Sequence, residues 1–229
     1  MTRALLIVAA AGLLASSRAI AQEYVEEPPW PTEEYPSGEW EAPPDPTLGR
    51  HVGFFFRADL GFGYLSTSAV VPVDGGRMRA SISGFAVSFG VTAGGAIAEN
   101  LILAGEAWIS SVDSPTFTSG GQSFRSDNAS LDLFGIGLQL TYWFMPANAY
   151  LSVTPSFSTL GTTEGNVTTE AQPGFGLKVA LGKEWWIGGH WGLGVAGQFF
   201  FGANADAGAP GPVTWTTLGG SVAITGTYN

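Results

Sequence analysis

The sequence predicts an all-β protein: an eight-stranded antiparallel up-and-down transmembrane β-barrel that follows a disordered N-terminal extension. Three observations predict this fold. Large apolar residues alternate with small or polar ones at the period of two that is typical of strands. The links between the alternating segments are short and long in turn. Charged residues make up only 12% of the chain, beside 33 glycines, whereas an average soluble domain has about 25% charged residues.

The N-terminal residues 1–21 have the pattern of a secretory signal peptide. Arg3 gives a positive start, residues 4–15 are an uninterrupted apolar run, and Ala19-Ile20-Ala21 fits the small-x-small cleavage rule. A retained spanning helix would need about 20 apolar residues, more than this run contains. We therefore expect an exported protein whose mature chain begins at Gln22.

Residues 22–51 form a predicted acidic, Pro-rich periplasmic linker. Residues 22–50 hold eight acidic side chains, one basic side chain and seven prolines, a composition that cannot support a hydrophobic core. Two interpretations stay open. The segment is a plain spacer, or Trp30 and Trp40 anchor a periplasmic partner.

Charge and cysteine content exclude several classes of function. Most of the formal net charge of −10 comes from the linker, and residues 51–229 contain only six Lys or Arg. Binding of nucleic acid by a basic surface is excluded, because these cations are too few to neutralise phosphates. The chain has no cysteine, so thiol chemistry and cysteine-ligated zinc are excluded too.

The first strand is predicted in "FFFRADLGFGYL", residues 54–65. Arg57 and Asp59 fall on one face of this strand together with glycines. The other face carries only apolar or aromatic residues, namely Phe54, Phe56, Ala58, Leu60, Phe62 and Tyr64.

Seven further segments repeat this contrast between a large apolar face and a face of Gly, Ser, Thr and Ala. They are residues 84–92, 101–109, 134–141, 151–157, 174–182, 192–201 and 217–228. Pro155 lies in the fifth of the eight strands, where it removes a ladder donor, and we expect a β-bulge there.

The links support an outer-membrane topology. Short links are expected at 94–100, 145–148 and 187–190, and long polar links between the other strands, for example 67–80 and 111–129. Outer-membrane barrels have short periplasmic turns and long outer loops. With eight strands, we expect both termini in the periplasm.

The polar face decides which side of the barrel meets lipid. A soluble lipocalin-like barrel also alternates, but its outer face is normally rich in charge, and this chain has no such face. Small polar residues suit the crowded interior of an eight-stranded barrel. We therefore expect Arg57 and Asp59 to point inward and the phenylalanines to face lipid.

Aromatic residues cluster near the predicted strand ends, as they do at membrane interfaces. A core cluster is the alternative for these residues. The expected interfacial residues are Phe54, Phe55, Phe56, Trp143, Phe144, Trp185, Trp186 and Trp191 at one end, and Tyr64, Phe157, Phe175 and Trp215 at the other.

From about residue 52 the chain resembles the small eight-stranded outer-membrane barrels of Gram-negative bacteria, the outer-membrane-protein-A-like or X-like group. The segment "GGAIAENLILAGEAW" is similar to their second hairpin, with a tight turn at Glu99-Asn100. The resemblance implies outer-membrane lipid, lipopolysaccharide and the barrel-insertion machinery as partners. Two features depart from the group: the chain ends Tyr228-Asn229, with the aromatic residue penultimate, and we expect no peptidoglycan-binding domain after the barrel.

The candidate site is a polar network in the lumen. Buried charges of both signs are expected to pair, because an isolated buried charge is costly. We expect Glu106 to accept hydrogen bonds from Arg57, from Lys178 or from both. The network is an ionic plug that stabilises the barrel, or it is part of a gated pathway for small ions. Its predicted members are Arg57, Asp59, Glu106, Gln139, Lys178 and Gln198.

No motif predicts catalysis, a cofactor or a metal. "GLGVAG" at residues 192–197 matches a dinucleotide fingerprint, but strand alternation continues through it, whereas the fingerprint requires a following helix. Asn128 and Asn166 begin glycosylation sequons that are incidental in a bacterial envelope. His51 and His190 are expected at the periplasmic rim as interfacial polar residues, too far from the outer leaflet for lipid hydrolysis.

Three functions follow from this reading. We favour a structural or surface-interaction role of an outer-membrane barrel through its extracellular loops. The first alternative is a narrow pore for ions or small solutes, and the second is a lipid-modifying enzyme, which the histidine positions disfavour.

Overall fold

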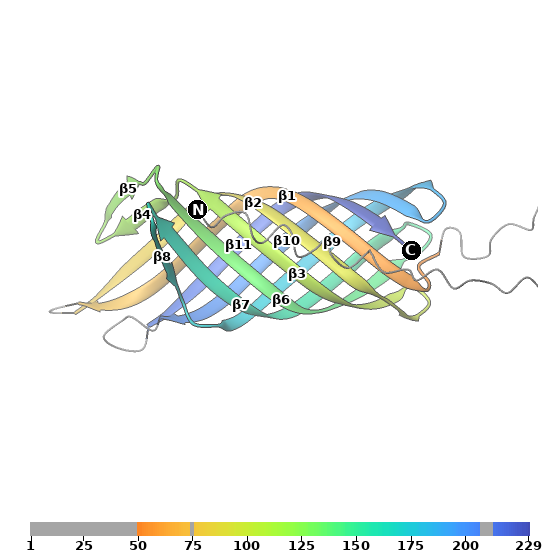
Figure 1. The fold of residues 1–229 in the computed structure, drawn as a ribbon, viewed down its shortest axis with the longest axis horizontal. Coiled ribbons are helices and arrows are strands. Elements are labelled where there is room, and N and C mark those ends of the chain that lie inside the picture. Colours follow the sequence, from red (N-terminus) through yellow and green to blue (C-terminus); the bar gives the residue numbers. More distant parts are fainter. Residues whose placement is uncertain (1–49, 74–75, 207–212) are drawn as a thin grey trace, which may run out of the picture. The chain divides into compact units, whose positions relative to one another are not determined.

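The computed structural model describes residues 50–73, 76–206 and 213–229, and Figure 1 shows them as tilted strands joined by turns. Eight long strands close into an antiparallel ring, because β1 pairs with both β2 and β11. The predicted eight-stranded barrel is confirmed. The ring strands are β1 (Phe54–Val73), β2 (Gly76–Ala98), β3 (Leu101–Asp113), β6 (Ala129–Phe144), β7 (Ala149–Glu164), β9 (Gly174–Gly188), β10 (Trp191–Asp206) and β11 (Val213–Tyr228).

The predicted signal peptide and the linker up to residue 49, with Trp30 and Trp40, lie outside the described residues. His51, which we placed in the linker, is fully buried against residues of the barrel. Among the described residues, no helix is long and apolar enough to cross a membrane.

One end of the ring carries the short turns, and we call it the short-turn end. The β2–β3 turn lies at Glu99 and Asn100, as predicted, and Asn100 has a φ of 63°. Asparagine is one of the few residues that adopts this left-handed conformation readily. The turns at residues 145–148 and 189–190 lie at the same end.

The opposite end, the hairpin end, differs from the expectation of long loops. The β1–β2 link predicted at 67–80 is an extended hairpin, in which pairing continues to Val73 and Gly76. The link 111–129 contains a second hairpin, made of β4 (Thr116–Ser119) and β5 (Gln122–Arg125), and β4 pairs with β2. After β7 the chain turns back as β8 (Val167–Glu170), which pairs with β7.

The bulge expected at Pro155 is absent from the described strands. The register between β6 and β7 is the same on both sides of the proline, from Gly137↔Ser156 to Leu140↔Val153. Pro155 still pairs with Leu177 of β9. The missing N–H therefore interrupts the ladder locally without inserting a residue.

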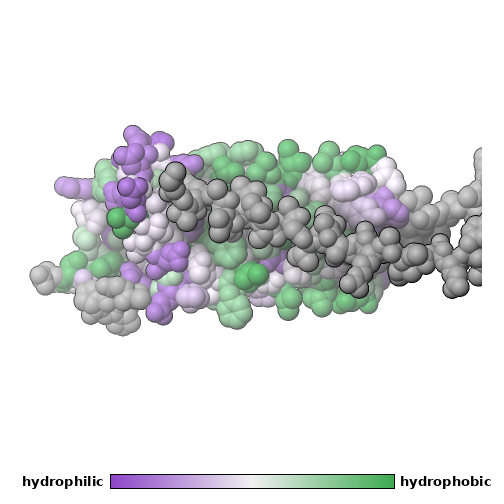
Figure 2. Space-filling view, in the orientation of Figure 1, coloured by the Kyte–Doolittle hydropathy of each residue, from purple (hydrophilic) through white to green (hydrophobic). Residues whose placement is uncertain are grey.

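The two faces of the wall are arranged as predicted. Arg57 and Asp59 are buried inside the ring, whereas Phe62 and Phe85 on the outer face are 53% and 65% exposed. Figure 2 shows hydrophobic residues along the wall and hydrophilic residues gathered at the hairpin end. Such a continuous apolar exterior requires a lipid environment, because soluble monomers rarely expose apolar patches larger than a few hundred Å².

Part of the predicted aromatic belt was wrong. Phe55 and Trp143 are fully buried inside the barrel, and Trp215 packs against an internal apolar cluster. Trp186 stacks on the buried His51 ring at a centroid distance of 5.1 Å. Runs of adjacent aromatics place every second ring inside, because side chains alternate across the wall.

Candidate functional site

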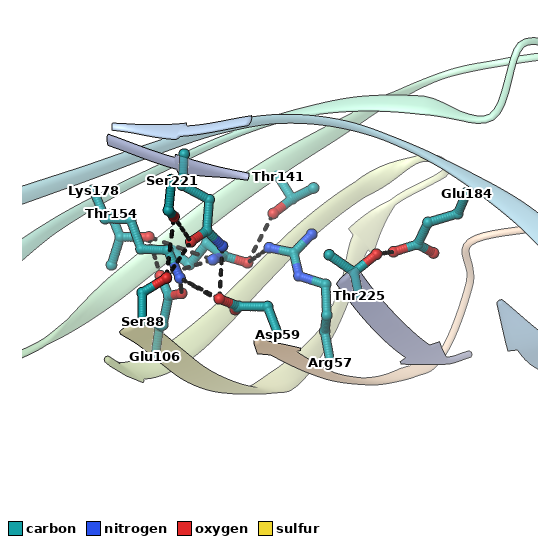
Figure 3. A network of polar contacts seen from close by, with 12 residues as sticks. Arg57, Asp59, Ser88, Glu106, Thr141, Thr154, Lys178, Glu184, Ser221 and Thr225 are labelled. Carbon is teal, nitrogen blue, oxygen red and sulfur yellow. Dashed lines mark hydrogen bonds and ion pairs between the residues drawn. The ribbon is translucent and has the colours of Figure 1, made fainter. Parts of the chain in front are cut away.

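The centre of the lumen holds a buried ion triad. The ammonium of Lys178 on β9 lies 3.1 Å from both carboxylate oxygens of Asp59 on β1, and 2.8 Å from Oε1 of Glu106 on β3. Each of these residues is at most 3% exposed. Figure 3 shows them converging from separate strands. The ammonium of Lys178, from the far side of the ring, is thus shared by two carboxylates on strands that are separated only by β2.

Gln198 extends the triad on the side of Asp59. Its Nε2 donates to Asp59 Oδ1 at 2.6 Å, and its Oε1 accepts from Ser221 Oγ at 3.0 Å. Ser88 is bonded to Ser221 at 3.0 Å. These hydroxyls complete the hydrogen bonding of Gln198, which a buried amide requires.

Gln139 extends the ion triad on the side of Glu106. Its Nε2 donates to Glu106 Oε2 at 2.8 Å, while its Oε1 accepts from Arg57 Nη2 at 2.7 Å and from Thr141 Oγ1 at 2.9 Å. Thr154 also donates to Glu106 Oε2. The amide therefore connects the guanidinium to the carboxylate.

The structure brings the six predicted network residues together, and of the two cations expected at Glu106 it places one in direct contact. Glu106 pairs with Lys178, but Arg57 reaches it only through Gln139. The face of the Arg57 guanidinium lies over the Tyr150 ring, 4.5 Å from its centroid. This cation–π contact compensates part of the desolvation of the guanidinium.

Glycines on the inner face make room for these side chains rather than for water. A Cβ at Gly90 would lie 2.5 Å from Asp59 Oδ2 and 2.8 Å from Lys178 Nζ. At Gly135 it would lie 2.4 Å from the indole of Trp108. The space beside these glycines is thus filled by Asp59 and Trp108 from the neighbouring strands and by Lys178 from across the lumen.

Sequence reasoning missed a buried glutamate. Glu184 on β9 is 1% exposed, and its Oε1 accepts hydrogen bonds from Thr225 at 3.0 Å and Thr227 at 2.6 Å. Its Oε2 has no hydrogen-bond partner among the described residues, and neither has Arg57 Nη1. Lys178, Ala180 and Gly182 are inward-facing positions two residues apart, and the next position in this series is Glu184. The alternation pattern therefore carries the signal that identifies Glu184.

Sequence reasoning also misplaced His51, which closes the short-turn end. Its ring stacks on Trp143 at 3.6 Å, and it is hydrogen-bonded to Asn148 at 2.7 Å and to Asn229 at 3.1 Å. Trp143 packs in turn on Tyr150 at 4.7 Å. The expected interfacial histidine is thus the centre of an aromatic plug.

A second apolar cluster fills the lumen on the hairpin side of the ion triad. Trp108 and Phe200 form its centre, with ring centroids 5.4 Å apart. Its other buried members are Leu65, Ile82, Ala86, Val112, Leu131, Leu133 and Leu160. In the described part of the chain the lumen is therefore packed on both sides of the polar network.

The described residues include no group of three or more His, Asp or Glu side chains placed to hold a metal ion. His51 and His190 both lie at the short-turn end, and His51 is enclosed by the plug.

The closed ring with its apolar exterior is similar to solved structures of outer-membrane proteins. The structure of Neisserial surface protein A (NspA) superposes with a TM-score of 0.51 over 77% of this chain and 96% of that protein, at 16% identity. The fold is that of a small outer-membrane β-barrel. The outer membrane protein OprG from Pseudomonas aeruginosa gives a TM-score of 0.49 at 12% identity, covering 80% of this barrel protein and 99% of OprG. No family model and no curated protein sequence matches the barrel protein.

Proposed function

We propose that the protein is an integral outer-membrane barrel with a closed lumen, whose hairpin end serves as a surface for interactions outside the cell. The observation that carries this proposal is the filled lumen beneath long polar hairpins. An ion triad lies between an aromatic plug and an apolar cluster. Such a barrel presents its hairpins rigidly and transmits no solute in this conformation.

The orientation in the membrane is part of the proposal. The hairpins β1–β2, β4–β5 and β7–β8 extend one end, whereas the other end has turns of a few residues. Bacterial outer-membrane barrels place their short turns in the periplasm. On this basis the N-terminal side of β1 and the C-terminal end of β11 face the periplasm.

Single-channel recording on the refolded barrel in a planar bilayer tests the closed lumen. We expect no steady conductance, together with a shift in migration on SDS gels between unheated and boiled samples. Steady conductance in every reconstitution would contradict the closed lumen, and recovery from cells without detergent would contradict membrane insertion.

A narrow gated pore is the second candidate function. It is favoured by buried polar atoms in the lumen that have no partner among the described residues, including Arg57 Nη1, Thr92 Oγ1 and Glu184 Oε2. Such atoms are commonly satisfied by water. Brief voltage-dependent openings in the same recordings would support this candidate over the closed barrel. A lipid-modifying enzyme, the disfavoured alternative, would release or transfer lipid acyl chains in the same sample. The closed barrel and the gated pore would not.

A further inference from the structure

A groove crosses the lipid-facing wall where two glycines replace large side chains. Gly220 of β11 lies between Tyr64 and Phe199, and Gly197 of β10 lies between Val222 and Leu181. A Cβ at Gly197 would have no atom within 4 Å. The groove over these glycines has a volume of about 700 Å³.

The edges of the groove are aromatic. Phe62 and Phe85 stack with centroids 6.4 Å apart, and Tyr64 beside them is 56% exposed. Between helices or strands in lipid, close packing replaces the hydrophobic effect as the driving force. A hydrocarbon chain that lies along the glycine backbone gains more contacts than one on an even wall.

Hydroxyl side chains lie on the same outer face beyond the β1–β2 edge of the groove, whereas Leu218 and Phe201 continue the apolar wall beyond its glycines. Strand register places Ser66, Ser83 and Thr116 in one row across β1, β2 and β4, and the row ends at Arg125 of β5. This row is two residues beyond Tyr64 and Phe85, about 7 Å along the strands. The next row consists of Ser68, Ser81, Thr118 and Ser123.

Arginines border these hydroxyl rows. Arg79 is opposite Val70, and Arg77 is opposite Pro72, both on the outer face by the same register. Neither arginine has an ion-pair partner in the described part of the chain. Arg125 pairs with Asp127 at 3.7 Å, but both side chains are mostly exposed, and such pairs contribute little.

The remaining charges of the hairpin end are distributed unevenly. Glu164 on β7, Glu170 on β8 and Asp206 on β10 lie away from the arginines, whereas Asp113 at the end of β3 and Asp132 on β6 lie nearer to them. The described outer face of β1, β2, β4 and β5 itself carries three arginines and no carboxylate, so this face attracts anions.

We propose that the outer face of β1, β2, β4 and β5, with the groove below it, binds one molecule of an acylated, phosphorylated sugar lipid from the surrounding leaflet. An acyl chain lies in the groove, sugar hydroxyls meet the Ser and Thr rows, and two phosphates lie one at Arg79 and the other at Arg125. The apolar groove, the hydroxyls and the arginines follow one another along the strands in the order that such a lipid requires. The inference rests on the proposed membrane orientation and adds a partner to it.

The test is native mass spectrometry of the full mature protein, refolded in detergent with a hexa-acylated glucosamine disaccharide that carries two phosphates. We expect one retained lipid per barrel. The double variant Arg79→Gln/Arg125→Gln should lower retention at least about tenfold, since each charge-assisted hydrogen bond contributes substantially to affinity. Gly197→Leu fills the groove and should lower retention of both this lipid and its dephosphorylated form.

Two matched variants control for the loss of charge and for added bulk. Lys183→Gln removes an exposed cation near the short-turn end, and Gly226→Leu adds a side chain on the outer face where a Cβ meets no atom. Both should retain the lipid as the wild type does. Equal losses in the control variants, equal retention of the dephosphorylated lipid by the wild type, or competition by a sulfated oligosaccharide without acyl chains would overturn the proposal. Gel migration of each unheated variant shows separately whether the barrel has folded. A failure of the barrel to fold is thereby distinguished from a loss of lipid binding by a folded barrel.

Discussion

Lys178 and Glu106 lie on strands that are not neighbours in the ring, yet Lys178 Nζ is 2.8 Å from Glu106 Oε1. The same ammonium also pairs with Asp59. The contact is a tie across the lumen, so it stabilises the cross-section of the barrel rather than a single hairpin. Breaking a buried pair costs more than its formation gains, because the remaining charge stays desolvated.

Glu106→Gln should destabilise the barrel by about 3 kcal/mol, at the lower end of the range for broken buried pairs because Lys178 keeps Asp59. Urea unfolding in lipid vesicles, followed by tryptophan fluorescence, measures the change. Asp113→Asn at the exposed end of the same strand is the control and should leave the midpoint unchanged. An unaltered midpoint in Glu106→Gln would show that the triad is not a stabilising element.

The same substitution at Glu184 should have the opposite outcome. Glu184→Gln keeps an oxygen that accepts from Thr225 and Thr227, and it removes a buried charge whose Oε2 has no partner among the described residues. We expect the free energy of unfolding to fall by no more than about 1 kcal/mol relative to the wild type, or to increase, because the cost of desolvating the carboxylate disappears. A loss as large as that of Glu106→Gln would mean that Glu184 has a bound cation or water as an essential partner.

Gln139→Leu should separate Arg57 from Glu106 at nearly constant volume. The variant removes the acceptor of Arg57 Nη2 and a donor to Glu106 Oε2, and unsatisfied charged groups cost more than about 1–3 kcal/mol. A double-mutant cycle with Glu106→Gln should give a coupling energy of about 0.5–3 kcal/mol. Strict additivity of the two single changes would contradict the relay through the amide.

His51 should make stability depend on pH. Burial lowers the pKa of His51 below its ordinary value of 6.5, and the hydrogen bonds to Asn148 and Asn229 only partly offset this. The unfolded chain then binds the proton more tightly than the folded barrel. The stabilising effect of the neutral ring is complete above pH 6.5 and is lost as the pH falls below it, by at most about 1.4 kcal/mol per pH unit. Unfolding curves from pH 8 to pH 5 for wild type and His51→Gln measure this, and identical pH profiles would contradict it.

A leucine pair on β6 tests the two faces of the wall. Leu133 is fully buried in the lumen, and Leu140 is 48% exposed on the outer face. Leu133→Ala should cost about 2–5 kcal/mol, because it leaves a cavity. Leu140→Ala should cost far less, because lipid fills the space. Equal costs would contradict the inside-out arrangement in this region.

The sequence was most informative where the strands cross the membrane. There, apolar and small polar residues alternate sharply, so the inward positions of Asp59, Glu106 and Lys178 followed from phase alone. Beyond Tyr64 and Phe85 the outer face also becomes polar. The contrast between the two faces disappears there, so the pattern predicts loops where the structure has paired strands. The alternation pattern predicts which face of the wall a side chain lies on and how far it lies from the strand end. It does not predict that the side chain of Gln139 lies between Arg57 and Glu106.

Only part of the plug could be predicted from the sequence. Tyr142, Trp143 and Phe144 are adjacent aromatics, and continuing the inward phase of Gln139 and Thr141 by one step places Trp143 inside. In the structure Trp143 stacks on His51, whereas Tyr142 and Phe144 contact each other on the outside, 5.0 Å apart and edge to face. His51 precedes the first strand, where alternation provides no information.

The bond between His51 and Asn229 joins residues that are 178 positions apart, beside the β1–β11 pairing. Contacts between such distant positions form late in folding, because the entropy of closing the intervening loop must be overcome first. Until this seam forms, β1 and β11 each present a row of unpaired backbone groups, which is a template for association with another chain. The folding intermediate most prone to aggregation is therefore the nearly complete sheet just before it closes, and variants that weaken the seam should lower refolding yield before they lower the stability of the closed barrel.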